Sequence, residues 1–99
     1  MYLWLFEPMW EYSYGYAAII APYIETAAKL LYEEYKKTEW DKDLSVEPIY
    51  QVLEHDTILI VEADKRPPHL PNLMKWEFID KIEVVEKEPS VIRYWQTEA

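Results

Sequence analysis

The stretch that decides the fold is residues 22–38, with the sequence PYIETAAKLLYEEYKKT. Pro22 suits a first helical position, because its missing N–H would have no partner there in any case. Beyond it, apolar residues recur at the spacing of one helix face: Ile24, Ala27, Ala28, Leu31 and Tyr35. The opposite face carries charges of alternating sign at every fourth position: Glu25, Lys29, Glu33 and Lys37. This pattern predicts an amphipathic helix over 22–38 whose apolar stripe is turned toward a core.

Downstream of this helix the chain changes to short runs of β-branched residues, which are typical of strands. Residues 48–53 and 57–62 flank Glu54-His55-Asp56, so we predict a hairpin with a three-residue loop. Residues 65–72 contain three prolines and are expected to form an ordered loop.

The last third of the chain contains two further predicted strands, 75–87 and 91–96, separated by a turn that holds Pro89. We expect these two strands to pair as a second hairpin. Apolar and charged residues alternate along 75–87, except that Asp80 falls on the apolar side. A bulge near Ile79-Asp80 would restore the alternation.

The amino-terminal segment is rich in aromatic side chains, with seven among the first 16 residues. Residues 1–6 are predicted to form a strand. For residues 9–20 two interpretations stay open. Aromatic residues occupy every second position from Trp10 to Tyr16, which favours a strand and hence a hairpin. A helix over the same residues fits as well, and Gly15 does not decide between the two.

Length and composition limit the architecture to a single domain over residues 1–99. Hydrophobic residues make up 51% of the chain, which separates it from disordered sequences. Together, the elements above predict an α+β domain in which one main helix packs on a mainly antiparallel sheet of four or five strands. The core is expected to include Ile58, Ile60, Trp76 and Phe78.

The net charge is −9, from 10 Lys and Arg against 19 Asp and Glu. This sign repels phosphates, and the aromatic first 28 residues contain no Lys or Arg, so we expect no nucleic-acid partner. The longest apolar stretch, residues 16–24, is too short for a bilayer, so no transmembrane span is expected. The start of the chain lacks the positive region of a secretory signal, and cysteine is absent, so we expect an intracellular protein without disulfides.

Motifs for catalysis and cofactor binding are absent from the sequence. A single glycine excludes phosphate-cradling loops, and none of the three serines lies in a nucleophile elbow. His55 between Glu54 and Asp56 offers metal-ligating atoms, but adjacent strand residues point to opposite faces, and His69 stands alone in a proline-rich stretch. We therefore expect no catalytic residue, no cofactor, no metal and no enzymatic activity.

Two segments carry a resemblance to a family: AAIIAPYIETAAKLLYEEYKK (17–37) and NLMKWEFIDKIEVVEKE (72–88). The chain resembles the small orphan proteins of lipothrixviruses and rudiviruses, the filamentous and rod-shaped DNA viruses of hyperthermophilic, acidophilic archaea. This family has no assigned activity and no functional residues to transfer. The resemblance implies a viral protein, in the host cytoplasm or in the virion, with an interaction role rather than a metabolic one.

Acidic residues concentrate between Glu39 and Asp64, where eight of them occur with Lys42 alone and give a net charge of −7. A field of one sign steers encounters with oppositely charged surfaces. We therefore expect a non-enzymatic interaction protein, such as an acidic inhibitor or phosphate-mimicking binder of a basic host or viral protein. The residues expected to bind this partner are Glu39, Asp41, Asp43 and Glu47.

Two alternatives stay open beside this hypothesis. The acidic segment could be a solvated surface that only aids solubility. The chain could instead be a structural or assembly component of the virion, with the exposed part of its aromatic amino-terminal segment serving self-association. The sequence does not determine the oligomeric state.

Composition also predicts hyperthermostability, because the chain has one Asn, two Gln, no Cys, one Gly and seven Pro. We expect a thermal midpoint above about 90 °C in differential scanning calorimetry at neutral pH. A midpoint near about 55 °C, which is ordinary for a mesophilic domain, would contradict this expectation.

Overall fold

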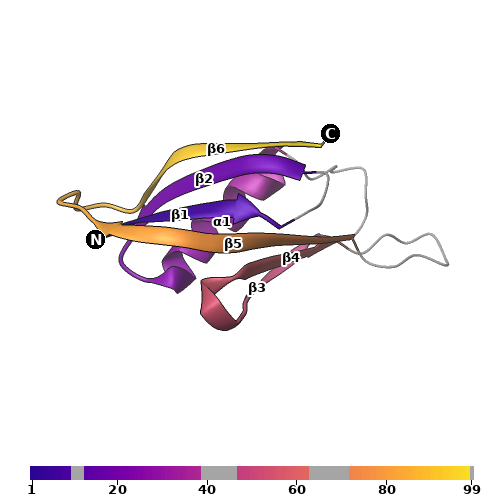
Figure 1. The fold of residues 1–99 in the computed structure, drawn as a ribbon, viewed down its shortest axis with the longest axis horizontal. Helices are drawn as coiled ribbons and strands as arrows, with labels where there is room; N and C mark the ends of the chain where they lie inside the picture. The colour runs from indigo at the N-terminus through magenta and orange to yellow at the C-terminus, as the bar shows by residue number, and fades with distance from the viewer. Residues whose placement is uncertain (10–12, 39–46, 63–71, 99) are drawn as a thin grey trace.

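Six strands and one α-helix follow one another in the computed structural model, which describes residues 1–9, 13–38, 47–62 and 72–98 (Figure 1). They are β1 (Tyr2–Pro8), β2 (Ser13–Ala21), α1 (Ile24–Thr38), β3 (Ile49–Val52), β4 (Ile58–Glu62), β5 (Asn72–Glu83) and β6 (Ser90–Glu98). The strands form one antiparallel sheet in the order β3-β4-β5-β1-β2-β6. The helix connects β2 to the edge strand β3 and lies against one face of the sheet.

The predicted α+β class is confirmed, with six strands in place of four or five. The additional strand is β2, which comes from the region that the sequence left open. β1 pairs with β2 in register from Tyr2 opposite Ala21 to Phe6 opposite Ala17, so the hairpin interpretation is confirmed and the helical one is wrong. Trp4 adds to this pairing, since its indole Nε1 donates a hydrogen bond to the carbonyl oxygen of Ala21 at 3.0 Å.

The predicted helix is confirmed, and it begins two residues later than expected, at Ile24. The reason is that the carbonyl of Tyr23 already accepts the first helical hydrogen bond, from the N–H of Ala27 at 3.1 Å, so Pro22 precedes the helix. Most of the predicted stripe is buried, namely Ala27, Ala28, Leu31 and Tyr35, with Ile24 packed against the core. The charged positions Glu25, Lys29, Glu33 and Lys37 are all exposed.

The predicted hairpin after the helix is also confirmed, as β3 paired with β4. The N–H of Leu53 donates to the carbonyl oxygen of Thr57 at 2.7 Å and closes the turn. Between them, His55 and Asp56 have positive φ angles of 59° and 57°, a conformation that histidine and aspartate tolerate better than most residues. The predicted loop over 65–72 lies outside the described residues except for Asn72, which begins β5.

β5 contains the predicted bulge. Its register against β1 shifts between Phe6, which lies opposite Phe78, and Leu5, which lies opposite Asp80, so Ile79 is the additional residue. The shift removes Asp80 from the side of the strand on which Phe78 lies. Ile82 changes sides as well. It was expected on the same side as Phe78, but it lies opposite Leu3 on the other side of the sheet.

The expected pairing of the last two strands is wrong. β5 pairs with β1, and β6 pairs with β2, so the β1–β2 hairpin separates them. Residues 84–89 connect β5 to β6 across the end of this hairpin, where the N–H of Val84 donates to the carbonyl oxygen of Met1 at 3.1 Å. The hairpin is preferred as a neighbour because both of its strands are apolar and can be buried on both sides.

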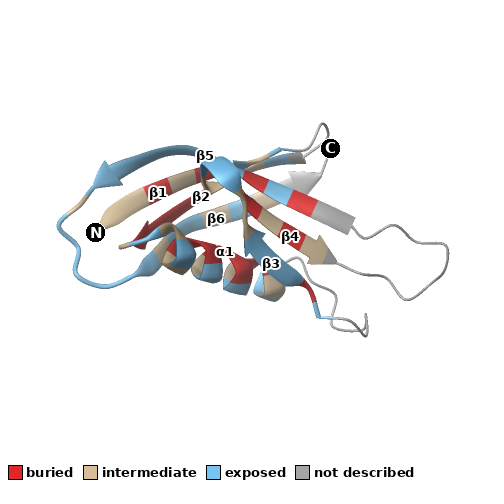
Figure 2. Ribbon diagram, turned by 90° about the horizontal axis from the view of Figure 1, so that it is seen from below, coloured by how far each residue is buried: buried red, intermediate tan, exposed pale blue. Residues whose placement is uncertain are grey.

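The core lies between α1 and the face of the sheet beside it, and its buried residues come from both the helix and the strands. Figure 2 marks the buried residues in red along the ribbon. Ile58, Ile60 and Trp76 are buried there as predicted, and the half-buried Phe78 packs against them. Trp76 is fully buried, with its ring centroid 5.3 Å from that of Tyr94. This tilted ring contact ties β5 to β6 under the hairpin that separates them.

Gly15 provides a test of this packing. A Cβ atom at this position would lie 2.7 Å from the carbonyl oxygen of Trp95 and 3.1 Å from Cγ of Pro8. Because the nearer atom belongs to the backbone of β6, the strand itself would have to move. We expect Gly15→Ala to lower the free energy of unfolding by about 1–3 kcal/mol, measured by denaturant titration.

The control for this experiment is Ser90→Ala at the exposed start of β6, which is expected to change stability by less than about 0.5 kcal/mol. A Gly15→Ala variant as stable as the wild type would show that β6 does not approach β2 this closely.

Candidate interaction surface

The face of the sheet opposite α1 is the candidate site, and we call it the outer face. Figure 1 looks onto it, and Figure 2 shows the sheet with the helix on its other side. In β1, Trp4 and Phe6 point into the core, so the alternating residues Leu3 and Leu5 belong to the outer face. The strand register extends this face to further apolar side chains in β2, β5 and β6: Tyr14, Tyr16, Ala18, Ile20, Ile82 and Trp95.

The outer face is apolar without belonging to the core. Ala18 and Ile20 are buried, yet neither belongs to the cluster of buried residues that packs with the helix. Around them, large side chains are open to solvent, with Tyr14 exposed to 61%, Ile82 to 48% and Trp95 to 40%. Gathered on one face, exposed apolar side chains of this size are typical of an interaction site.

The outer face also carries charged side chains. One line of mutually opposed residues crosses four strands, with a carboxylate at one end and a guanidinium at the other: Asp80, Leu5, Ala18 and Arg93. Glu7 lies directly opposite Glu77, and like charges in such a pair destabilise a sheet. Both ion pairs found among the described residues involve Lys36 of the helix, so none of these outer-face charges is neutralised by one of them.

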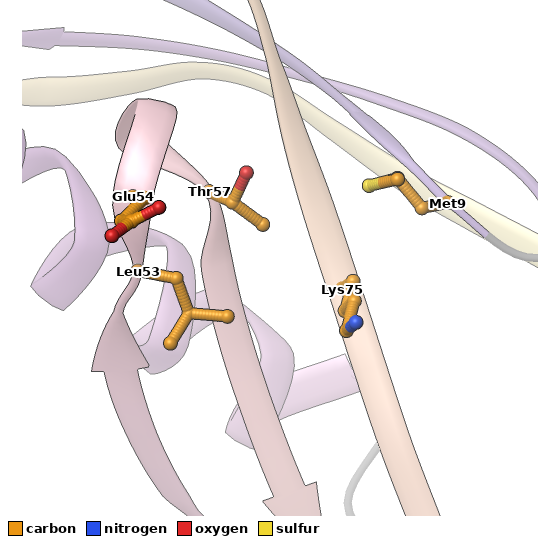
Figure 3. A pocket seen from close by; sticks show the side chains of 5 residues that line it. All are labelled: Met9, Leu53, Glu54, Thr57 and Lys75. Carbon is orange, nitrogen blue, oxygen red and sulfur yellow. The ribbon is translucent and has the colours of Figure 1, made fainter.

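A shallow pocket of about 350 Å³ lies beside the turn between β3 and β4 (Figure 3). Its lining consists of Met9, Leu53, Glu54, Thr57 and Lys75. One carboxylate, one amine and one hydroxyl are its side-chain polar groups, and they lie among aliphatic atoms. Like the outer face, this lining sets charged groups among apolar ones.

Of the four acidic residues predicted to bind a partner, Glu39, Asp41 and Asp43 lie outside the described residues. Glu47 is exposed, and its Oε1 accepts a hydrogen bond from Nζ of Lys36 at 2.8 Å. This bond to the carboxylate raises the pKa of Lys36. Glu47 therefore holds the residues before β3 against the helix.

Tyr32 forms a second attachment between α1 and β3. Its hydroxyl donates a hydrogen bond to the carbonyl oxygen of Pro48, and its ring centroid lies 4.6 Å from that of Tyr50. Nζ of Lys36 lies 4.6 Å from the Tyr32 ring centroid on the same side of the helix. Burial raises the pKa of Tyr32 above its ordinary value, an effect that the nearby Lys36 charge opposes.

Of the residues considered for metal binding, His55 and its neighbours Glu54 and Asp56 are among the described residues. Within the described ranges, no three His, Asp or Glu side chains gather where they could hold a metal ion. His55 is exposed on its turn, and the second histidine, His69, lies outside these ranges. In the same described part of the chain, no helix has the length and apolar character that a bilayer crossing requires.

Comparison with protein-family models, with curated proteins and with solved structures finds no match to this chain.

The sequence did contain a signal for the outer face. Apolar residues occupy consecutive positions in Leu3 to Phe6 and again in Ala17 to Ala21, so both strands are apolar on both sides. A strand with one solvated face shows alternation instead. The absence of alternation in two neighbouring strands indicates a second apolar surface.

Tyr32→Phe tests the attachment of β3 to the helix. Without the hydroxyl, the carbonyl of Pro48 loses its donor, and we expect the free energy of unfolding to fall by about 0.5–1.5 kcal/mol at neutral pH. A raised pKa favours the neutral phenol in the folded state. Its stabilisation is complete below the ordinary tyrosine pKa and is lost as pH rises through the folded pKa.

The difference in unfolding free energy between wild type and Tyr32→Phe should therefore shrink between about pH 7 and about pH 11. Tyr23→Phe, at a position that is 68% exposed, serves as the control and should leave the free energy of unfolding at neutral pH nearly unchanged. A constant difference over this range would contradict the role assigned to the hydroxyl.

Proposed function

We propose that this chain is a non-enzymatic interaction protein that binds another protein surface through the outer face of its sheet. The observation that supports the proposal is the exposure of Tyr14, Ile82 and Trp95 around the buried pair Ala18 and Ile20. Aromatic and aliphatic side chains of this kind are enriched at the centres of protein interfaces.

The charges of the outer face favour a protein ligand over a membrane. Glu7, Glu77 and Asp80 lie on the same face as the apolar residues, and carboxylates are repelled by anionic lipid headgroups. A protein partner can offer a cation to a carboxylate on this face, which anionic headgroups do not. The resemblance to archaeal virus proteins supports the same class of role, directed either at a host protein or at virion assembly.

Recognition of a basic partner by the acidic segment is a second proposal. It is favoured by the −7 charge between Glu39 and Asp64, within a total of −9. Glu47 fits this role in part, because its side chain is 62% exposed while it bonds to Lys36. Charge alone selects no particular partner, so this surface would act mainly on encounter rate.

Site-specific photo-crosslinking tests the first proposal. A photoreactive phenylalanine replaces Tyr14 or Ile82 on the outer face, and the labelled protein is irradiated in a lysate of its native host. We expect discrete covalent adducts from both positions, because the bound surface lies within reach of each side chain. Gel electrophoresis with mass spectrometry identifies them.

The matched control places the same photoreactive residue at Tyr23, which is 68% exposed just before α1. Equal adduct yields at Tyr23 and at the outer-face positions would contradict the first proposal. The combined variant Asp41→Lys, Asp43→Lys and Glu47→Lys addresses the second. If it abolishes the outer-face adducts at low salt, the acidic segment and not the outer face governs recognition.

A further inference from the structure

We infer that the partner of the outer face is a second copy of this chain, packed face to face about a two-fold axis that runs along the strands between β1 and β2. This inference rests on the proposed function and specifies the partner. Its basis is the placement of opposite charges at the two ends of the line Asp80, Leu5, Ala18 and Arg93.

A two-fold axis of this orientation exchanges the two sides of the outer face. The residue of β5 in the line then lies over the residue of β6 in the other copy, and β1 lies over β2. Asp80 of each copy meets Arg93 of the other, with Leu5 over Ala18 between them. The result is two ion pairs at the ends of an apolar centre, which is the self-complementarity that an isologous interface requires.

Distances permit this contact. Packed sheets lie about 10 Å apart, a gap that an arginine and an aspartate side chain span together. The usual rotation of about 30° between packed sheets displaces each end of the line by a few ångströms, within the reach of the flexible arginine. Both Asp80 and Arg93 are exposed, and neither takes part in the ion pairs of the described residues. Oδ1 of Asp80 accepts a hydrogen bond from the backbone N–H of Lys81 at 2.8 Å, so its second carboxylate oxygen is the one that faces the arginine of the other copy.

The other two-fold arrangement is unfavourable. An axis across the strands through this line would place Asp80 against Asp80 and Arg93 against Arg93. Moving that axis to the neighbouring row would place Glu7 against Glu7 and Glu77 against Glu77, since these two residues share a row. An axis through the row on the other side, with Ile82, Leu3 and Ile20, opposes no like charges but leaves Asp80 and Arg93 unpaired, so only the axis along the strands pairs these opposite charges.

The size of the surface indicates a weak interface. Four strands about 4.8 Å apart and three outward rows about 7 Å apart offer roughly 400 Å² on each copy. About 800 Å² in total is the size of a weak interface, so we expect a dissociation constant on the order of 10–100 µM.

Analytical ultracentrifugation of the full chain, from about 5 to about 500 µM in about 0.15 M salt, tests the inference. We expect a monomer–dimer equilibrium in the wild type. Asp80→Arg sets arginine against Arg93, and Arg93→Asp sets aspartate against Asp80, so each single variant loses both ion pairs. Each should weaken the dimer by about tenfold or more.

The double variant Asp80→Arg with Arg93→Asp reverses both ion pairs and should restore dimerisation to within about threefold of the wild type. Glu25→Arg and Lys29→Asp on the exposed face of α1 are the controls, because they change the net charge by the same amounts away from the interface. Any effect of net charge alone on the dimer dissociation constant is measured by these two controls, which otherwise should dimerise like the wild type.

Three outcomes would overturn the inference: a wild type that stays monomeric to about 500 µM, single variants no weaker than their controls, or a double variant that is not restored. A monomer that still gives outer-face adducts with a different protein would remove the second copy as partner and leave the proposed function standing. A dimer with no outer-face adduct would remove both.

Discussion

The pairing of β1 with β5 is the contact on which the rest of the structure depends. It joins the first strand of the chain to a strand near its other end, and the loop-closure entropy of such a contact must be offset by burial. Trp4 and Phe6 provide that burial, since both are buried in β1 and both contact the ring of Phe78. Without this pairing, the β1–β2 and β3–β4 hairpins would not belong to one sheet and would not share a core. Isolated hairpins are only marginally stable in water.

Two irregularities shape the outer face, one in the pairing of β1 with β5 and one in the pairing of β2 with β6. Trp76, Phe78 and Asp80 would lie on one side of a regular strand, which would direct the Asp80 carboxylate toward the helix. The additional residue Ile79 shifts the register, so Asp80 lies opposite Leu5 on the outer face. Lys81 then takes the inner side at the sheet end, with its Nζ 4.7 Å from the ring centroid of Tyr2. A similar shift near Ile92 in β6 keeps Arg93 opposite Ala18 on the outer face while Val91 packs against the core.

The parts of this fold that could be predicted from sequence are those with a local pattern. The helix, the β3–β4 hairpin and the bulge at Ile79 each follow from the spacing of neighbouring residues. The neighbour of β6 in the sheet could not be predicted in this way. Tyr94 and Trp95 point to opposite faces of the sheet whether β6 pairs with β5 or with β2. Which strand lies beside β6 is decided by which strand can bury both of its sides. The spacing of residues within β6 contains no information about that. The same holds for the site: Asp80 and Arg93 lie on consecutive strands of the chain, but β1 and β2 lie between these strands in the sheet, so the two residues share a line only through three strand pairings.

The helix covers only one of the two apolar faces of the amino-terminal hairpin. β1 and β2 carry apolar residues on both faces, a pattern that belongs to strands covered on two sides. The helix removes one of these faces from water. On the other, Ala18 and Ile20 are shielded within the sheet, while Tyr14 and Ile82 remain largely in water. Selection for stability alone would place polar residues at those exposed positions, since they add little to the fold. Their apolar character, bounded by charges of both signs, is better accounted for by a surface that is buried only when another protein is bound.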